Sequence, residues 1–186
     1  MLSLDNPFWR FSLDVYSAPG VAPECLALQD ALGIDVNLLL FAAWAGAGPG
    51  VALTDDEFAA AEPLVAEWRD RVVRPLRAAR RDIKHMALHG EPEVAEFRKA
   101  VAGVELEAER IEQALLWDWA SRRWGEPAAP APSRPVRANI ETCLGRSRAE
   151  PGTGGLRPEC LERAALAHRA EPSEGRRTGP IQSSRG

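Results

Sequence analysis

An apolar run extends from Gly33 to Gly46 and is interrupted only by Asp35 and Asn37. Asp35 is placed to accept the first free N–H groups of a helix. The apolar residues that follow occupy both faces of this helix rather than one stripe. A helix that is apolar all round must be covered on every side, and this one is too short to span a bilayer. The pattern therefore predicts a buried central helix over residues 35–46.

Two shorter helices are predicted before the central one. Asn6 and Pro7 are typical of a helix start, because Asn caps the helix and Pro at its first position loses no needed hydrogen bond. Apolar rows follow in helical spacing, and residues 18–20 form a turn. Pro23 begins the second helix, and Gly33 is its expected C-cap.

A long amphipathic helix is predicted over residues 55–89. Thr54 and Glu57 have the spacing of a capping box, in which each side chain satisfies a backbone donor of the other residue. We expect Pro63 to interrupt or restart this helix and Pro75 to kink it, because proline lacks the N–H that the helix needs.

A second long helix, over residues 92–124, carries the most regular apolar pattern of the chain. Apolar residues recur there in steps of three and four, which predicts a near-heptad seam. The seam residues are Val94, Phe97, Val101, Val104, Ala108, Ile111, Leu115 and Trp119. Two long amphipathic helices joined by a short turn are predicted to form an antiparallel hairpin, so the fold class is all-α with about five helices.

The composition changes after Gly125. Every Trp, Phe and Tyr precedes it, whereas residues 126–186 are rich in Pro, Arg, Ala and Gly. We therefore predict a globular domain over residues 1–125 and a disordered tail over residues 126–186. The tail has too little apolar surface to fold alone, so its removal is expected to leave the melting temperature nearly unchanged.

Charge and cysteine content limit the functional classes. The net charge of −4 combines an acidic domain with a mildly basic tail, which makes nucleic acid an improbable partner. The N-terminus lacks the features of a signal peptide, and no apolar run reaches the length of a membrane helix. The three cysteines do not form a disulfide framework. These features favour a cytoplasmic protein that does not bind membranes.

Several segments resemble an uncharacterised family of small proteobacterial proteins. They are residues 8–16 (FWRFSLDVY), 19–21 (PGV), 28–30 (LQD), 33–40 (GIDVNLLL), Trp44, 68–69 (WR), 73–77 (VRPLR) and 80–81 (RR). The resemblance implies a small helical bacterial protein. Because that family has no assigned activity, the resemblance assigns no catalytic residue.

The sharpest charge feature is an arginine stripe on the first long helix. It consists of Arg74, Arg77, Arg81 and Lys84, spaced by three and four. Such a stripe can bind a phosphate-bearing or acidic ligand, because guanidinium groups match phosphate oxygens. Alternatively, it pairs with an acidic row on the second long helix. That row consists of Glu105, Glu109 and Glu112.

A second candidate is a set of polar residues within the apolar N-terminal sequence. It comprises Arg10, Ser12, Asp14, Tyr16, Gln29, Asp30, Asp35 and Asn37. Buried polar groups need partners, so these side chains either fix how the short helices cross or line a polar pocket beside the central helix.

The sequence gives little indication of a metal site, a catalytic nucleophile or a nucleotide-binding loop. His85 and His89 have a spacing that can bring two imidazoles to one metal, but a frayed helix end explains them as well. Cys25 lies on an apolar face, which favours a core position over a nucleophile. Neither a phosphate-binding glycine loop nor a nucleophile elbow is present. We therefore expect no metal, no cofactor and no catalytic residue.

The sequence predicts a non-catalytic binding or adaptor module whose partner is another protein. The alternative is a small-ligand-binding protein or enzyme that uses the polar pocket together with the arginine stripe. An exposed apolar or charged groove favours the adaptor, whereas a pocket of converging polar groups favours the alternative. The sequence leaves the oligomeric state open.

Overall fold

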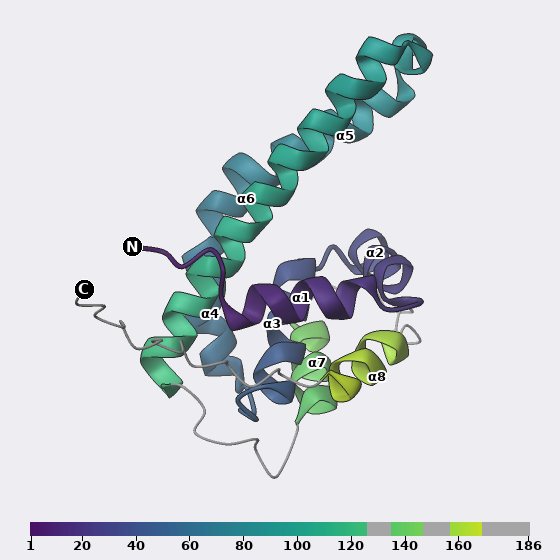
Figure 1. Cartoon of the computed structure of the whole chain (residues 1–186). Coiled ribbons are helices and arrows are strands. Elements are labelled where there is room, and N and C mark those ends of the chain that lie inside the picture. Colours follow the sequence, from purple (N-terminus) through teal and green to yellow (C-terminus); the bar gives the residue numbers. More distant parts are fainter. Residues whose placement is uncertain (126–134, 147–156, 169–186) are drawn as a thin grey trace, which may run out of the picture.

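The central element of the fold is α3 (Val36–Ala47). The computed structural model describes residues 1–125, 135–146 and 157–168, and every regular element in these ranges is helical. The other elements are α1 (Pro7–Ser17), α2 (Val21–Leu32), α4 (Asp55–Trp68), the π-helical turn η1 (Arg69–Val73), α5 (Arg74–His85), the 3₁₀ turn η2 (Ala87–Gly90), α6 (Pro92–Trp124), α7 (Val136–Gly145) and α8 (Glu159–Ala167). The predicted all-α fold is confirmed. Figure 1 shows a helical body from which α5 and α6 extend together as an arm.

Helices α1 and α3 begin as their sequences predict, whereas α2 begins at Val21, two residues before the predicted Pro23. The Asn6 side chain accepts a 2.8 Å hydrogen bond from the N–H of Trp9 at the start of α1. At the start of α3, the Asp35 carboxylate accepts a bond of 2.8 Å from the N–H of Asn37. Residues 37–47 are all buried, which confirms the predicted buried central helix.

The first long helix continues through Pro63, contrary to the prediction, and is irregular next to Pro75. The capping box of Thr54 and Glu57 is present, but α4 runs through Pro63 without interruption. Pro63 is exposed, so the carbonyl that loses its helical partner faces water. The irregularity lies just before Pro75, where the N–H of Arg74 donates to the carbonyl of Arg69 five residues back. A π-helical turn thus absorbs the missing donor of Pro75.

The arm is the predicted antiparallel hairpin, with α6 packed on α4 and α5. The first half of the predicted apolar seam of α6, however, is not its buried face, whereas Ala108 is buried and Leu115 and Trp119 pack against the core. Phe97 and Val104 are 61% and 55% exposed, whereas Glu105 and Glu112 are buried. The prediction is wrong here because α5 presents arginines to α6. Pairing with Arg77 and Arg80 turns Glu105 inward and leaves Phe97 and Val104 at the edge of the contact.

Two segments of the predicted tail are helices that pack on the body. In α7, the side chains of Val136 and Ile140 are buried in the hydrophobic core, and in α8 those of Leu161 and Ala165 are also buried there. The expectation that residues after 125 contribute nothing to the core is therefore wrong for α7 and α8. The reason is that α3 is apolar all round, and α7 and α8 cover the sides that the other helices leave open.

Close polar and backbone contacts hold α7 in place. A Cβ atom added at Gly46 would lie 2.7 Å from the backbone nitrogen of Val136, so α7 packs directly on the backbone of α3. The buried Asn139 accepts a hydrogen bond from the N–H of Leu53 (2.8 Å). Its amide donates to the carbonyls of Ala42 (3.1 Å) and Val51 (2.8 Å). One side chain thus ties α7 to backbone groups of α3 and of the loop that follows it.

The α8 helix is held by a side chain of α2. The Glu24 carboxylate accepts hydrogen bonds from the N–H groups of Cys160 (3.0 Å) and Leu161 (2.8 Å) at the start of α8. The rest of the predicted tail, residues 126–134, 147–156 and 169–186, lies outside the described residues. The domain boundary at residue 125 and the disorder of those ranges stay predictions.

No helix within the described ranges combines the length and apolar character that crossing a membrane requires.

Candidate functional site

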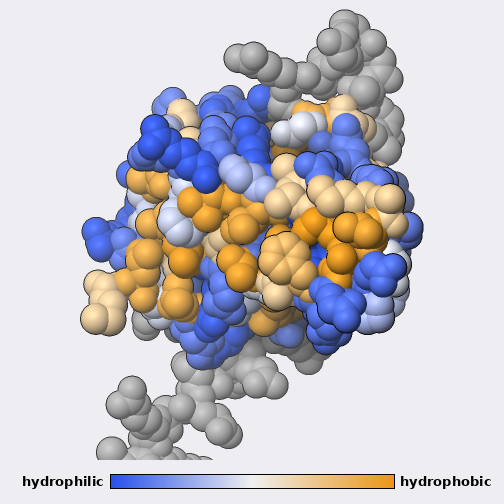
Figure 2. Space-filling model, turned by 90° about the horizontal axis from the view of Figure 1, so that it is seen from above, coloured by the Kyte–Doolittle hydropathy of each residue, from blue (hydrophilic) through white to orange (hydrophobic). Residues whose placement is uncertain are grey.

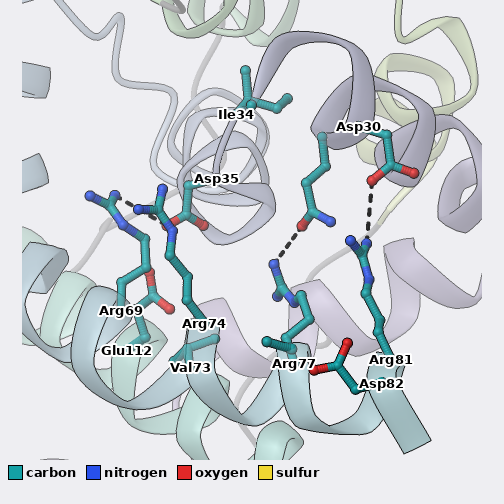
Figure 3. A pocket seen from close by; sticks show the side chains of 13 residues that line it. Asp30, Ile34, Asp35, Arg69, Val73, Arg74, Arg77, Arg81, Asp82 and Glu112 are labelled. Carbon is teal, nitrogen blue, oxygen red and sulfur yellow. Dashed lines mark hydrogen bonds and ion pairs between the residues drawn. The ribbon is translucent and has the colours of Figure 1, made fainter. Parts of the chain in front are cut away.

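A cleft of about 480 Å³ lies between α5 and the turn that joins α2 to α3 (Figure 3). This volume falls in the range of small-molecule sites. The residues that line it are Gln29, Asp30, Gly33, Ile34, Asp35, Arg69, Val73, Arg74, Arg77, Ala78, Arg81, Asp82 and Glu112. They come from α2, the α2–α3 turn, η1, α5 and α6, so the cleft forms only in the folded chain.

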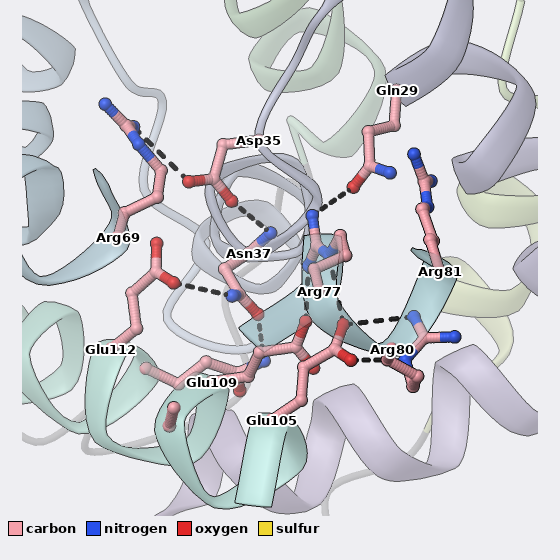
Figure 4. Close-up of polar contacts among 12 residues, drawn as sticks. Gln29, Asp35, Asn37, Arg69, Arg77, Arg80, Arg81, Glu105, Glu109 and Glu112 are labelled. Atoms are coloured by element: carbon pink, nitrogen blue, oxygen red, sulfur yellow. Dashed lines mark hydrogen bonds and ion pairs between the residues drawn. The ribbon is translucent and has the colours of Figure 1, made fainter. Parts of the chain in front are cut away.

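A buried polar network forms one end of the cleft (Figure 4). Asp35 accepts a hydrogen bond from Arg69 (3.3 Å), which ties the start of α3 to η1. The Asn37 side chain donates to Glu112 (2.9 Å) and accepts from Gln113 (2.9 Å), which ties α3 to α6. Each connection joins two elements, so the network fixes the position of α3 relative to the arm.

The carboxyl group of Glu112 is the unusual member of this network. Its side chain is fully buried, and burial together with the negative charge of Asp35 raises its pKa to about 9. Glu112 is therefore protonated at neutral pH. If the group were a carboxylate, its Oε1 atom would be buried without accepting any hydrogen bond. Once protonated it donates to Asp35, and this bond favours the neutral form further.

Arg77 forms the middle of the cleft and is fully engaged by protein acceptors. It donates to Glu105 (3.1 Å) on α6 and to Gln29 (2.6 Å) on α2. Its third nitrogen donates to Glu109, and Arg80 also donates to Glu105. Arg77 therefore joins both walls of the cleft and has no guanidinium nitrogen left without an acceptor.

The pKa values of the two acids that bind Arg77 are shifted in opposite directions. Burial opposes ionisation of Glu105, but hydrogen bonds from Arg80 and Arg77 outweigh it and lower its pKa. For Glu109, burial dominates over the attraction of Arg77 and raises the pKa.

Arg74 and Arg81 are the accessible cations of the cleft. Their side chains are 56% and 48% exposed, against 13% for Arg69 and 21% for Arg77. Arg74 contacts Asp70 at 2.8 Å, and Arg81 contacts Asp30 at 3.3 Å. Exposed pairs of this kind contribute about 0–1 kcal/mol each, so a ligand acid can replace the aspartates at little cost.

Most of the candidate residues predicted from the sequence lie at this site, and five lie elsewhere, among them Ser12 and Asp14 of α1. Six of the candidates line the cleft, namely Gln29, Asp30, Asp35, Arg74, Arg77 and Arg81. Asn37 belongs to the network at its end. Arg10 pairs with Asp5 on the exposed side of α1, and Lys84 is exposed farther along α5. Tyr16 is half-buried outside the lining, and burial raises the pKa of its hydroxyl.

The arginine stripe follows the pairing alternative only at its centre. Arg77 contacts the predicted acids Glu105 and Glu109, whereas Arg74 and Arg81 pair with aspartates. The difference arises because the helical rotation of α5 points these two toward the cleft and away from α6. Sequence reasoning missed Arg69 as a cleft residue and the neutral state of Glu112, since both depend on burial between separate elements.

Other candidate chemistry receives no support from the geometry. The described residues contain no group of three or more His, Cys, Asp or Glu side chains arranged to hold a metal ion. His89 contacts the carbonyl of Met86 at 2.9 Å. Burial raises the pKa of the Cys25 thiol to about 12, so this thiol is not a nucleophile at neutral pH.

Comparison with known proteins places the chain in a family. Residues 7–116 match a family model described as "Protein of unknown function (DUF2390)". The chain belongs to this family. No curated protein and no solved structure matches the chain. The matched range contains every residue that lines the cleft and ends before α7 and α8, so the cleft belongs to the part of the chain that the family defines.

Proposed function

We propose that the protein is a non-catalytic binding module that holds a small anionic molecule in the cleft between α2 and α5. The observation that carries the proposal is the contrast among the four arginines of the cleft. Arg69 and Arg77 are partly buried and bound to acids of the fold, whereas Arg74 and Arg81 are half-exposed with only weak surface partners. Guanidinium groups presented over a cleft of this size are suited to carboxylate or phosphate groups.

The residues of the cleft favour binding over catalysis. The lining consists of Arg, Asp, Glu, Gln and apolar residues, and among these lining residues there is no Ser, Cys, His or Lys to act as a nucleophile. Glu112 carries a proton but donates it to Asp35 inside the fold. A general acid needs its proton free for the reacting group of a bound molecule, whereas the proton of Glu112 is engaged by Asp35.

Binding of inorganic phosphate and of citrate provides the test. Isothermal titration calorimetry at low salt is expected to detect at least one of these anions. The double variant Arg74→Gln/Arg81→Gln is expected to weaken the binding at least about tenfold, because it removes both accessible guanidinium groups that can form charge-assisted hydrogen bonds with an anion. Binding should also weaken as the salt concentration rises.

Arg122→Gln is the matched control, because Arg122 is an exposed arginine of α6 that pairs with Asp118 away from the cleft. It is expected to bind like the unmodified protein. Equal binding by the double variant and by this control would contradict the proposal.

A second candidate function is docking of a protein partner on the arm, and it rests on exposed apolar side chains. Figure 2 shows hydrophobic residues gathered on the face seen from above. Five large apolar side chains of the arm are between 45% and 62% exposed, and apolar surface on a projecting element is typical of an interaction site. They are Met86, Leu88, Phe97, Val104 and Leu106.

Replacing these apolar side chains with polar ones is expected to abolish binding of a specific protein partner. Affinity capture with the double variant Leu88→Ser/Phe97→Ser should lose a protein that the unmodified chain retains, because the desolvated apolar contact is gone. Leu64→Ser is the control, since Leu64 is 43% exposed on α4 in the body. Retention of the same proteins by all three chains would exclude the arm as the docking surface.

A further inference from the structure

We infer that the cleft selects a linear molecule with an acid group at each end, one held by Arg74 and the other by Arg81. The inference rests on the proposed function and narrows its ligand to a class. Three features of the cleft lead to it: the separation of the two accessible arginines, the residue between them, and the uncharged surface beneath them.

The two arginines are too far apart along α5 to share one small anion in the arrangement observed. They are seven positions apart in the helix, which corresponds to two turns and about 10 Å along the helix axis. Both lie on the side of α5 that faces α2 and the α2–α3 turn, as Figure 3 shows. The Arg81 side chain reaches Asp30 at the α2 end, whereas the Arg74 side chain points toward Asp35 at the other end.

Arg77 keeps the two accessible guanidinium groups from converging. It lies between them on the same side of α5 and reaches across the cleft to Gln29. Its remaining nitrogens donate to two acids of α6. Moving Arg77 aside would leave the partly buried Glu109 without its cation and take one of two arginines from the buried Glu105, which is costly. A ligand therefore meets two separate cationic ends with an occupied arginine between them.

The middle of the cleft suits an uncharged chain. Ala78 follows Arg77 on α5, and Gly33 and Ile34 lie on the opposite wall. A Cβ atom added at Gly33 would meet nothing within 4 Å, so this wall leaves open space. Methylene groups fit such a surface better than a further charge does. Asp82 at the Arg81 end would repel a third acid group.

The acid ends of the ligand would replace the surface aspartates on the two arginines. In the free protein Arg74 pairs with Asp70, and Arg81 pairs with Asp30, each at the surface. Exchange of one carboxylate for another conserves the charge pairing, and both aspartates gain water in return. Holding both ends at once makes the second contact intramolecular, so a diacid of matching length gains affinity over a monoacid.

A series of α,ω-dicarboxylates tests the inference. Isothermal titration calorimetry measures the affinities for butanedioate, hexanedioate, octanedioate and decanedioate. Each is compared with the affinity for the monocarboxylate of the same chain length. We expect the affinity to peak at a long member of the series and to exceed that of the matched monoacid at least about tenfold. Alkane bisphosphonates of the same lengths distinguish the acid groups, and a length optimum in either series supports the inference.

Three variants locate the two ends and the middle. Arg81→Gln and Arg74→Gln should each reduce the affinity for the best diacid to that of a monoacid. Ala78→Leu should weaken long diacids while leaving inorganic phosphate unaffected, because Ala78 is exposed on α5 and its enlargement fills only the space between the ends. Arg122→Gln is again the control, with unchanged binding of every compound.

The outcomes separate this inference from the proposed function. If monoacids and diacids bind equally at every length and binding still depends on Arg74, the cleft is an anion site and the diacid inference is overturned. If no diacid binds but inorganic phosphate or citrate does, only the diacid inference is overturned. If none of these anions binds, both are overturned.

Discussion

Removal of residues 126–186 is expected to lower the melting temperature by at least about 10 °C. The change deletes α7 and α8, which cover α3, and leaves the apolar side of α3 in contact with water. Val136, Ile140 and Leu161 are each at most 2% exposed. Full burial of such a side chain contributes about 1.5–3 kcal/mol. The cost of ordering the two helices offsets part of the sum, but the remainder is a large share of the stability of an ordinary domain.

Thermal unfolding followed by circular dichroism measures this effect, and a glycine pair tests its cause. Gly46→Val places a side chain against the backbone of Pro135 and Val136, so it should displace α7 and reproduce much of the loss. Gly103→Ala is the control, because nothing lies within 4 Å of a Cβ atom added there. In an exposed helix interior it should raise stability by about 0.5–1 kcal/mol. A truncated chain that melts like the full chain would contradict the observed packing of α7 and α8.

The free energy of unfolding is expected to fall by about 3 kcal/mol between pH 5.5 and pH 8, because Glu112 is buried as a neutral acid. Its pKa in the folded chain is about 9, against 4.5 for an ordinary glutamate. Between these values the unfolded chain releases the proton and the folded chain keeps it. The stabilisation that neutral Glu112 provides is therefore fully present below its pKa in the unfolded chain. It is lost as the pH rises through its pKa in the folded chain, by up to about 1.4 kcal/mol per pH unit.

Urea unfolding at several pH values measures this slope, and Glu112→Gln isolates it. The glutamine amide can accept from Asn37 and donate to Asp35, as the protonated acid does, but it has no proton to release. The variant should therefore lose most of the pH dependence and be more stable than the unmodified chain at pH 8. Glu107→Gln, at an exposed position of α6, should keep the original slope. An unchanged slope in Glu112→Gln would mean that Glu112 is ionised in the fold.

Prediction of the candidate site from the sequence succeeded where residues share one helix. The spacing of Arg74, Arg77 and Arg81 places them on one side of α5, and all three line the cleft. Their different roles did not follow from the spacing. Arg77 became a buried link between two walls and the other two stayed accessible, because each meets a different neighbour across the cleft.

Glu112 shows the limit of charge patterns most clearly. In the sequence it belongs to a regular acidic row with Glu105 and Glu109, and all three would be expected to carry a negative charge. In the fold, Glu105 keeps its charge beside two arginines, whereas Glu112 lies next to Asp35 and takes up a proton. Protonation depends on burial and on charges from other elements, and neither can be derived from spacing along one helix.

The sequence by itself determined the helical class, the capped starts of α1, α3 and α4, and the buried central helix. Each of these depends on residues within a few positions of one another, where hydrogen-bond donors and apolar spacing act locally. The tertiary structure alone decided which face of α6 is buried and that α7 and α8 complete the core. The sequence showed that α3 needs a cover on every side. Which segment supplies that cover depends on long-range packing, and α7 and α8 have too little apolar surface to be recognised by themselves.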